Sequence, residues 1–125
     1  MTTICRVQGE RGRGPWKPGF SRSWVQDRPD HDNLQPIMEE FPAVVDEIMR
    51  GTYSRYHIGT GTRTEDQLRR WINYREYTLL LKAGYNAVYM GVYKIIAESD
   101  TQVLFIRLKP LYLDAVWFDL YAETQ

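Results

Sequence analysis

A stretch near the N-terminus combines the residue types that suit close approach to an anionic ligand. The residues from Arg6 to Trp24 read RVQGERGRGPWKPGFSRSW, with four glycines, two prolines and five basic side chains. A loop this rich in glycine is either a tight turn or a surface that lets the backbone come close to a ligand. We expect Gly12, Arg13 and Gly14 to form one wall of a cleft.

The charges favour two interpretations of this stretch. Basic residues dominate up to Arg22, and acidic residues dominate from Asp27 to Glu47. The two segments either pair with each other in the fold or leave a basic pocket near the N-terminus for an anionic ligand.

Further polar residues come later in the chain, where they precede regular elements. Hydroxyl groups cluster in the run TYSRYHIGTGT, which contains Tyr53, Tyr56, Thr60 and Thr62. Gln102 opens an apolar segment, and Glu98 and Asp100 come directly before it; these are the residue types that could contact a sugar or stabilise a positive charge.

Several known catalytic motifs are absent from the sequence. It contains no G-x-x-x-x-G-K-[ST], no G-x-S-x-G and no H-E-x-x-H. The GRGP run is not a dinucleotide-binding fingerprint, because no helix is expected directly after it. The adjacent Asp30, His31 and Asp32 are a weak metal signal, so we expect no metal site. We interpret His57 as a partly buried, hydrogen-bonded residue.

Composition indicates one soluble domain over residues 1–125 with an ordinary apolar fraction of 43%. Sixteen basic residues balance sixteen acidic ones, which argues against general nucleic-acid binding.

Cys5 has no second cysteine to pair with, as expected in a reducing compartment. We found no signal peptide and no apolar run of the roughly 20 residues that span a bilayer, and we expect a cytoplasmic protein.

The pattern of elements predicts an α+β fold with a mainly antiparallel sheet and two or three helices. Two helix starts carry capping boxes, at Thr64 and Asn73, and Gly84 is placed to end the second helix. The other expected elements are strands at Thr2–Val7, Thr52–Ile58, Tyr85–Tyr93, Gln102–Leu108 and Leu111–Leu120, a helix at Pro42–Arg50 ended by Gly51, and a tight turn at Gly59–Thr62.

This order of polar residues resembles the ADP-ribosyltransferase fold. Its members carry an Arg or His on the first strand, a Ser, Thr or Tyr on a central strand, and a Glu that opens a later strand. The stretch GYNAVYMGVYKIIAESDTQVLFIRLKPL is similar to the closing pattern of that family. The resemblance implies that NAD is used and that nicotinamide is lost through an oxocarbenium-like state.

Carried onto this chain, the resemblance places Arg6 against a ribose or phosphate of NAD. The central position would be filled by Thr60 or Thr62, or by Tyr53 or Tyr56. Gln102 stands where the family has its catalytic Glu, and an amide cannot supply the negative charge of a carboxylate. The resemblance therefore implies that Glu98 or Asp100, expected in the acceptor-recognition loop, substitutes, or that the fold is retained without transfer activity.

A second resemblance is to small proteins of phages and prophages. It rests on the opening R-V-x-x-x-x-G-R-G-P-W-x-P-G-F-S, the Q-L-R-R-W segment and the S-D-T-Q turn. It implies a role inside a bacterial host, on a host protein or a nucleoprotein complex. Three functions remain open: ADP-ribosyl transfer, inhibition of a host defence complex such as CRISPR by direct contact, and a structural part of the phage.

Overall fold

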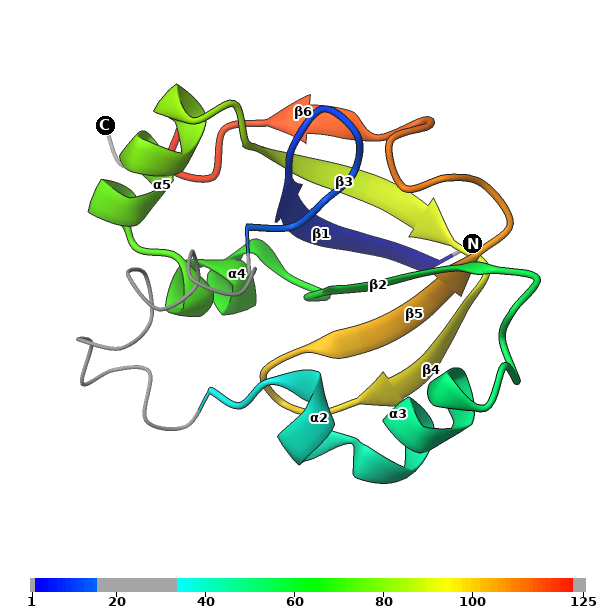
Figure 1. Ribbon diagram of the computed structural model, residues 1–125. Helices are drawn as coiled ribbons and strands as arrows, with labels where there is room; N and C mark the ends of the chain where they lie inside the picture. Colours follow the sequence, from blue (N-terminus) through cyan, green and yellow to red (C-terminus); the bar gives the residue numbers. More distant parts are fainter. Residues whose placement is uncertain (1, 16–33, 123–125) are drawn as a thin grey trace.

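Two three-stranded antiparallel sheets form the centre of the protein (Figure 1). The computed structural model describes residues 2–15 and 34–122. One sheet has the strand order β1-β3-β6, and the other has the order β2-β5-β4. The bounds are β1 Thr2–Gln8, β2 His57–Gly61, β3 Asn86–Val92, β4 Lys94–Glu98, β5 Val103–Arg107 and β6 Val116–Phe118. The predicted α+β class with antiparallel strands is confirmed.

The two sheets meet where β1 adjoins β2. Cys5 and Thr62 exchange two backbone hydrogen bonds of 2.8 Å, and this isolated bridge is the pairing that joins the sheets within the described residues. A Cβ at Gly61 would lie 2.6 Å from the carbonyl oxygen of Cys5, and one at Gly59 would lie 2.4 Å from Nη1 of Arg6. Glycine at both positions lets β2 pass this close to β1.

This close passage corrects the prediction for the second strand. The expected strand Thr52–Ile58 is mostly turn, and β2 begins at His57. The expected tight turn at Gly59–Thr62 is instead extended strand as far as Gly61. Gly59 and Gly61 allow the backbones of β1 and β2 to approach each other closely and do not form a turn. Glycine within a strand often occurs at such a close approach.

Four helices lie in the described part of the chain, in two pairs (Figure 1). The pair α4 (Glu65–Trp71) and α5 (Tyr74–Lys82) begins with the predicted capping boxes at Thr64 and Asn73, which are both formed. The pair α2 (Ile37–Glu40) and α3 (Pro42–Met49) lies along the β5–β4 sheet. The helix α3 and its end at Gly51, with φ 85°, were predicted; the short helix α2 was not.

The core has two parts, one on each face of the β1-β3-β6 sheet. One face carries Cys5, Val7 and Ala87 and packs against Leu68 and Leu80 of α4 and α5. The other face packs against the second sheet, through the apolar residues Ile4, Val88, Met90, Val92, Val103 and Phe105. Because side chains alternate along a strand, Arg6 and Gln8 lie on the second face, beside the junction of the sheets.

The late strands differ from the prediction in extent. β4 falls in the segment Lys94–Glu98, where no strand was expected. The expected strand Leu111–Leu120 is reduced to β6, because Pro110 starts a turn in which the amide of Leu113 donates to the Pro110 carbonyl at 3.1 Å. Proline cannot donate to a strand ladder, and it fits the start of a turn.

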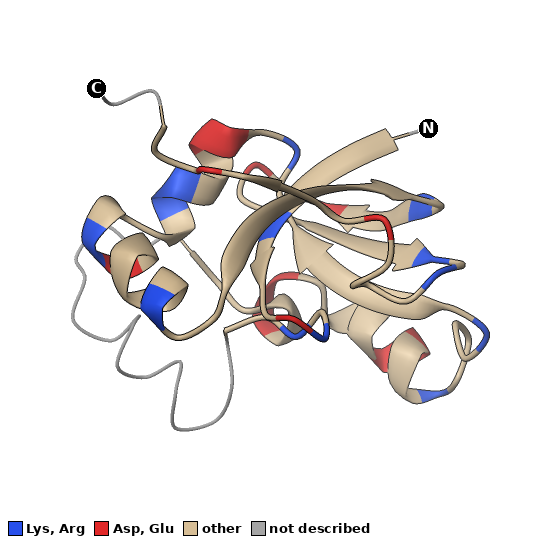
Figure 2. Cartoon of the chain, turned by 90° about the horizontal axis from the view of Figure 1, so that it is seen from above, with Lys and Arg blue, Asp and Glu red and all other residues tan. Residues whose placement is uncertain are grey.

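Charged residues of both signs are scattered over the helices and loops drawn in Figure 2. They do not gather on one basic face of the described part of the chain, although a local basic group lines the cleft described below. None of the helices in residues 2–15 and 34–122 is long and apolar enough to cross a membrane.

Candidate functional site

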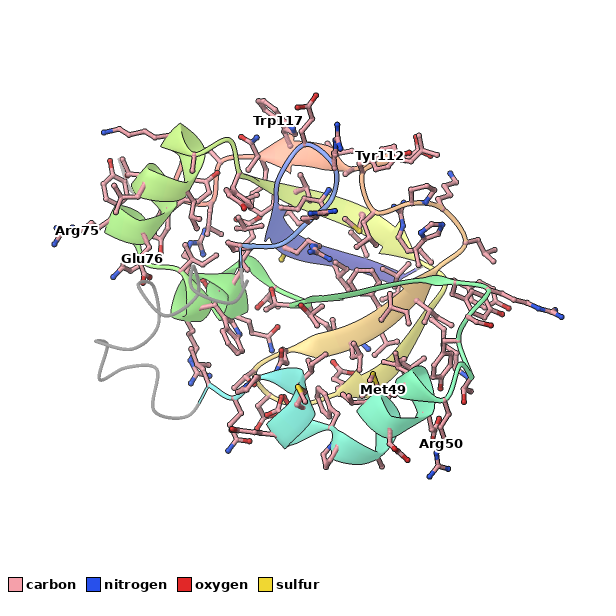
Figure 3. All side chains as sticks on the ribbon, in the orientation of Figure 1. Met49, Arg50, Arg75, Glu76, Tyr112 and Trp117 are labelled. Carbon is pink, nitrogen blue, oxygen red and sulfur yellow. The ribbon has the colours of Figure 1, made fainter. Side chains whose placement is uncertain are left out.

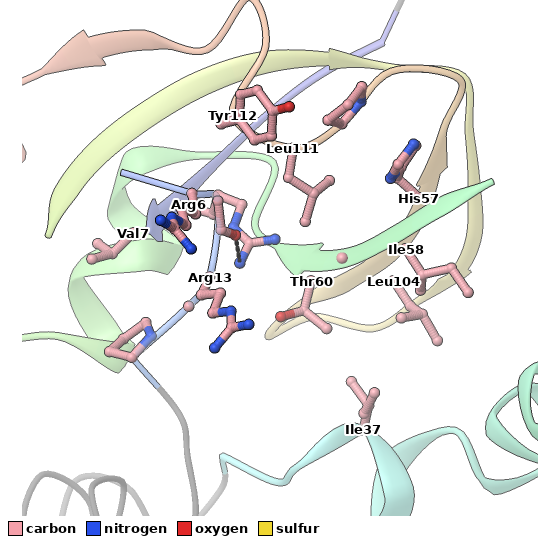
Figure 4. Close-up of a pocket in the computed structure, with 16 residues that line it drawn as sticks. Arg6, Val7, Arg13, Ile37, His57, Ile58, Thr60, Leu104, Leu111 and Tyr112 are labelled. Atoms are coloured by element: carbon pink, nitrogen blue, oxygen red, sulfur yellow. Dashed lines mark hydrogen bonds between the residues drawn. The ribbon is translucent and has the colours of Figure 1, made fainter. Parts of the chain in front are cut away.

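A cleft of about 770 Å³ lies between the loop after β1 and the strand β2 (Figure 4). Arg6 and the loop residues Gly12, Arg13 and Gly14 form one side, as predicted for the loop. Thr60 and Leu104 line the opposite side, from β2 and β5. The cleft therefore forms where the two sheets diverge from the Cys5–Thr62 bridge.

Arg6 is a buried cation with unused hydrogen-bonding capacity. Its side chain is 7% exposed, and Nη2 donates to the Gly12 carbonyl at 3.3 Å. Nε and Nη1 have no hydrogen-bond partner within the described residues. Burial lowers the pKa of the Arg6 guanidinium to about 10, because a charge loses its hydration when it leaves water.

The lining of the cleft is positively charged. Arg6, Arg11 and Arg13 contribute to it, and no Asp or Glu belongs to the described residues that line it. His57 is exposed at this lining, so the prediction of a partly buried histidine is wrong. Because buried polar groups are almost always paired, an unpaired guanidinium in a basic cleft points to an anionic ligand.

A smaller pocket of about 50 Å³ continues from the cleft and holds the three residues that the family resemblance singled out. Arg6 from β1, Thr60 from β2 and Gln102 directly before β5 all line it. These residues are separated by up to 96 positions in the sequence, and the junction of the two sheets brings them together.

The side chain of Gln102 is fixed at its nitrogen end. Nε2 donates to the Gln35 carbonyl at 2.6 Å and to Oε1 of Glu40 at 3.0 Å. Both amide hydrogens are used in this way, so the carbonyl oxygen of Gln102 is the atom left to accept a hydrogen bond from a ligand.

Glu40 is a site residue that the sequence did not reveal. Its carboxylate accepts hydrogen bonds from Ser99 Oγ at 2.6 Å and from Thr101 Oγ1 at 3.3 Å, in addition to that from Gln102. Glu40 lies on the four-residue helix α2, which has no periodic pattern, and its partners come about 60 positions later. No local sequence signal marks such a contact.

Several predicted site residues take other roles. Thr62 also lines the small pocket, but its hydroxyl is buried and donates to the Thr64 carbonyl at 2.8 Å. The ring of Tyr56 stacks on Tyr93, with centroids 5.5 Å apart. Glu98 forms an exposed ion pair with Arg63, which lowers the pKa of the Glu98 carboxyl by hydrogen bonding.

Glu98 and Asp100 are not among the described residues that line either pocket. The reason is the direction of the β4–β5 turn: Asp100 is exposed there, and its carbonyl accepts from Gln67 Nε2 at 3.0 Å. The triplet Asp30, His31 and Asp32 lies outside the described residues.

Comparison with known proteins found one partial similarity. Human cytochrome b5 reductase 4 is 33% identical over 81 residues, which make up 65% of this chain. The chain spans 15% of the length of that protein, so the activity of the whole reductase is not carried over to it. No family model matches the chain. No solved structure matches it.

Proposed function

We propose that this chain is an ADP-ribosyltransferase-like protein that binds NAD in the cleft between β1 and β2. The observation that carries the proposal is the unpaired, buried guanidinium of Arg6 in a lining with no acid among its described residues. The diphosphate of NAD is an anion that would supply the missing partners. A planar guanidinium with several N–H donors suits phosphate oxygens better than a point charge does.

The remaining residues fit the ribose next to the nicotinamide. Thr60 lines both pockets and offers a hydroxyl. Gln102 offers its carbonyl oxygen, because Gln35 and Glu40 hold its nitrogen. In the proposed reaction the bond between nicotinamide and ribose breaks, nicotinamide leaves with the electron pair, and a nucleophile of the acceptor bonds to the ribose and loses a proton to water.

The role of Glu40 in this proposal is to orient Gln102 rather than to contact the ribose. A carboxylate behind the amide holds the carbonyl oxygen toward the small pocket and raises the electron density on it by a charge-assisted hydrogen bond. Because Gln102 carries no charge, we expect transfer to be slow compared with that of an enzyme that has a carboxylate at this position.

Calorimetry with NAD, paired with detection of released nicotinamide, tests the proposal. Wild type is expected to bind NAD, and Arg6→Met is expected to weaken binding about 10- to 100-fold, the effect of losing charge-assisted hydrogen bonds. Arg70→Met removes the same charge from an exposed position on α4 and serves as the control. Absence of NAD binding to wild type, or equal losses in the two variants, would refute the proposal.

A second candidate function is stoichiometric inhibition of a host protein or nucleoprotein complex by direct contact. The observation that favours it is the number of exposed large apolar side chains on the segment from Tyr112 to Trp117, namely Tyr112, Leu113, Val116 and Trp117. Titration of the inhibited complex separates the two functions. Inhibition that needs one copy of this chain per target and no NAD supports contact, whereas NAD-dependent inhibition at lower ratios supports transfer.

A further inference from the structure

A second pocket lies on the other side of the loop that follows β1. Its volume is about 390 Å³, and its lining includes Gln8, Glu10, Asn86, Tyr112 and Trp117. In Figure 3, Tyr112 and Trp117 flank this loop at one end of the molecule. It shares Tyr112 with the cleft between β1 and β2, and we name it the Trp117 pocket.

The pairing of the strands explains why these side chains meet. Gln8 lies directly opposite Asn86, and Val88 lies between Arg6 and Trp117 in the neighbouring row. Side chains directly opposite each other in an antiparallel sheet point to the same face. Arg6 and Trp117 therefore belong to one row on one face, and they line different pockets.

Two segments in contact separate the pockets. A Cβ on Gly12 would lie 2.9 Å from Cβ of Leu111, and Nε2 of Gln8 donates to the Leu111 carbonyl at 3.0 Å. The loop after β1 thus rests on the segment before β6. Arg11 and Arg13 of this loop line the NAD cleft, whereas Glu10 lines the Trp117 pocket.

Two polar groups of the Trp117 pocket, on Gln8 and Glu10, are available to accept hydrogen bonds. Gln8 is 4% exposed, its nitrogen is committed to Leu111, and its oxygen Oε1 has no partner within the described residues. Glu10 adds a carboxylate, and no Lys or Arg belongs to the described lining. A ligand with N–H donors and positive charge would complement these two acceptors.

The aromatic and apolar surroundings favour a guanidinium on a protein. Trp117 is 72% exposed and Tyr112 is 53% exposed, and a guanidinium stacks on such rings better than an ammonium does. Leu113, next to Tyr112 in the chain, is also exposed, at 45%. A small free cation would leave these apolar side chains in water, whereas a partner protein would cover them.

We propose that the Trp117 pocket binds an arginine side chain of a partner protein. Glu10 and the carbonyl oxygen of Gln8 accept from the guanidinium, and Trp117 stacks on it. The inference goes beyond the proposed function, because the binding requires no NAD and holds equally for a transferase acceptor and for a target inhibited by contact.

Titration by NMR with defined peptides tests the pocket in the absence of NAD. The probes are the acetylated peptide amides Gly-Gly-Arg-Gly-Gly and its citrulline counterpart, which keeps the shape and loses the charge. We expect the arginine peptide to shift the indole N–H signal of Trp117 saturably and to bind at least about tenfold tighter than the citrulline peptide, the size of one charge-assisted contact. Equal binding of the two peptides, or no saturable shift, would overturn the proposal.

Matched variants locate the effect. Glu10→Gln is expected to remove most of the preference for arginine over citrulline, whereas Glu39→Gln, at an exposed acid on α2, keeps it. Trp117→Ala is expected to abolish binding, and Trp117→Phe is expected to restore part of it, read from the amide signals of Gln8. Unchanged binding in both Glu10→Gln and Trp117→Ala would place the peptide elsewhere, and equally tight binding of free agmatine would overturn the assignment to a partner protein.

Discussion

Replacement of Arg6 by methionine is expected to make the ligand-free protein more stable. The side chain is 7% exposed and holds a charge whose Nε and Nη1 have no partner within the described residues. Burial of an unpaired charge is costly, and removal of the charge relieves that cost. A site built to bind an anion would therefore be destabilising until the anion arrives.

The size of the expected stabilisation follows from the lowered pKa of Arg6. Burial lowers the pKa of Arg6 well below its ordinary value, to about 10, which corresponds to a penalty of about 3 kcal/mol on the charged form, at about 1.4 kcal/mol per pKa unit. Loss of the 3.3 Å hydrogen bond to Gly12 costs about 1 kcal/mol. The free energy of unfolding should rise by about 2 kcal/mol, and the Tm by about 6 °C.

Arg107 is the matched control, because it is similarly buried, at 4% exposed, and its Nε and Nη1 both donate hydrogen bonds. It donates to the Gly91 carbonyl at 2.9 Å and to the Pro110 carbonyl at 2.7 Å. Arg107→Met leaves both carbonyls without this donor, and we expect it to lower the free energy of unfolding by about 2–4 kcal/mol. The same mutation at two buried arginines should thus have opposite signs.

Urea unfolding followed by tryptophan fluorescence measures both variants without ligand. The increase in the free energy of unfolding of Arg6→Met should be constant between pH 6 and 9. The pKa of Arg6 is lowered in the folded protein, so the energetic penalty on its charged form is fully present at every pH below about 10. A loss of stability in Arg6→Met, or equal changes in the two variants, would refute the reasoning.

Three further predictions concern the junction of the sheets and the support of the site. Gly61→Ala should lower the free energy of unfolding, measured by urea unfolding, by about 3 kcal/mol, because the new Cβ would lie 2.6 Å from a backbone carbonyl oxygen. Gly9→Ala, whose Cβ would have its nearest contact at 3.5 Å, should lower it by less than about 1 kcal/mol. Gln102→Glu should lower the Tm, because the new carboxylate would repel that of Glu40, to which the Gln102 amide donates at 3.0 Å. The double variant Glu40→Gln, Gln102→Glu should recover most of the lost Tm. If the double variant recovers nothing, the two residues do not act as a unit. Cys5 should react with a thiol reagent only as fast as the protein unfolds, since the side chain is fully buried and burial raises the pKa of its thiol; rapid labelling of the folded protein would contradict this.

Local features of the fold could be predicted from the sequence because they depend on neighbouring residues. The capping boxes at Thr64 and Asn73 join residues three positions apart, and Gly84, with φ 91°, follows α5 as expected. Gly12, Arg13 and Gly14 of the loop after β1 line the cleft, and their role in binding a ligand stays a prediction.

The tertiary structure alone decided which polar residues share the site. Gly59 and Gly61 suggest a turn when only the sequence is considered, and they are needed in a strand because β1 passes beside them. Glu40 reaches Gln102 across 62 positions, and Gln8 and Trp117 line one pocket although they lie 109 positions apart. Such contacts are set by the register and packing of the sheets, which no short window of sequence contains.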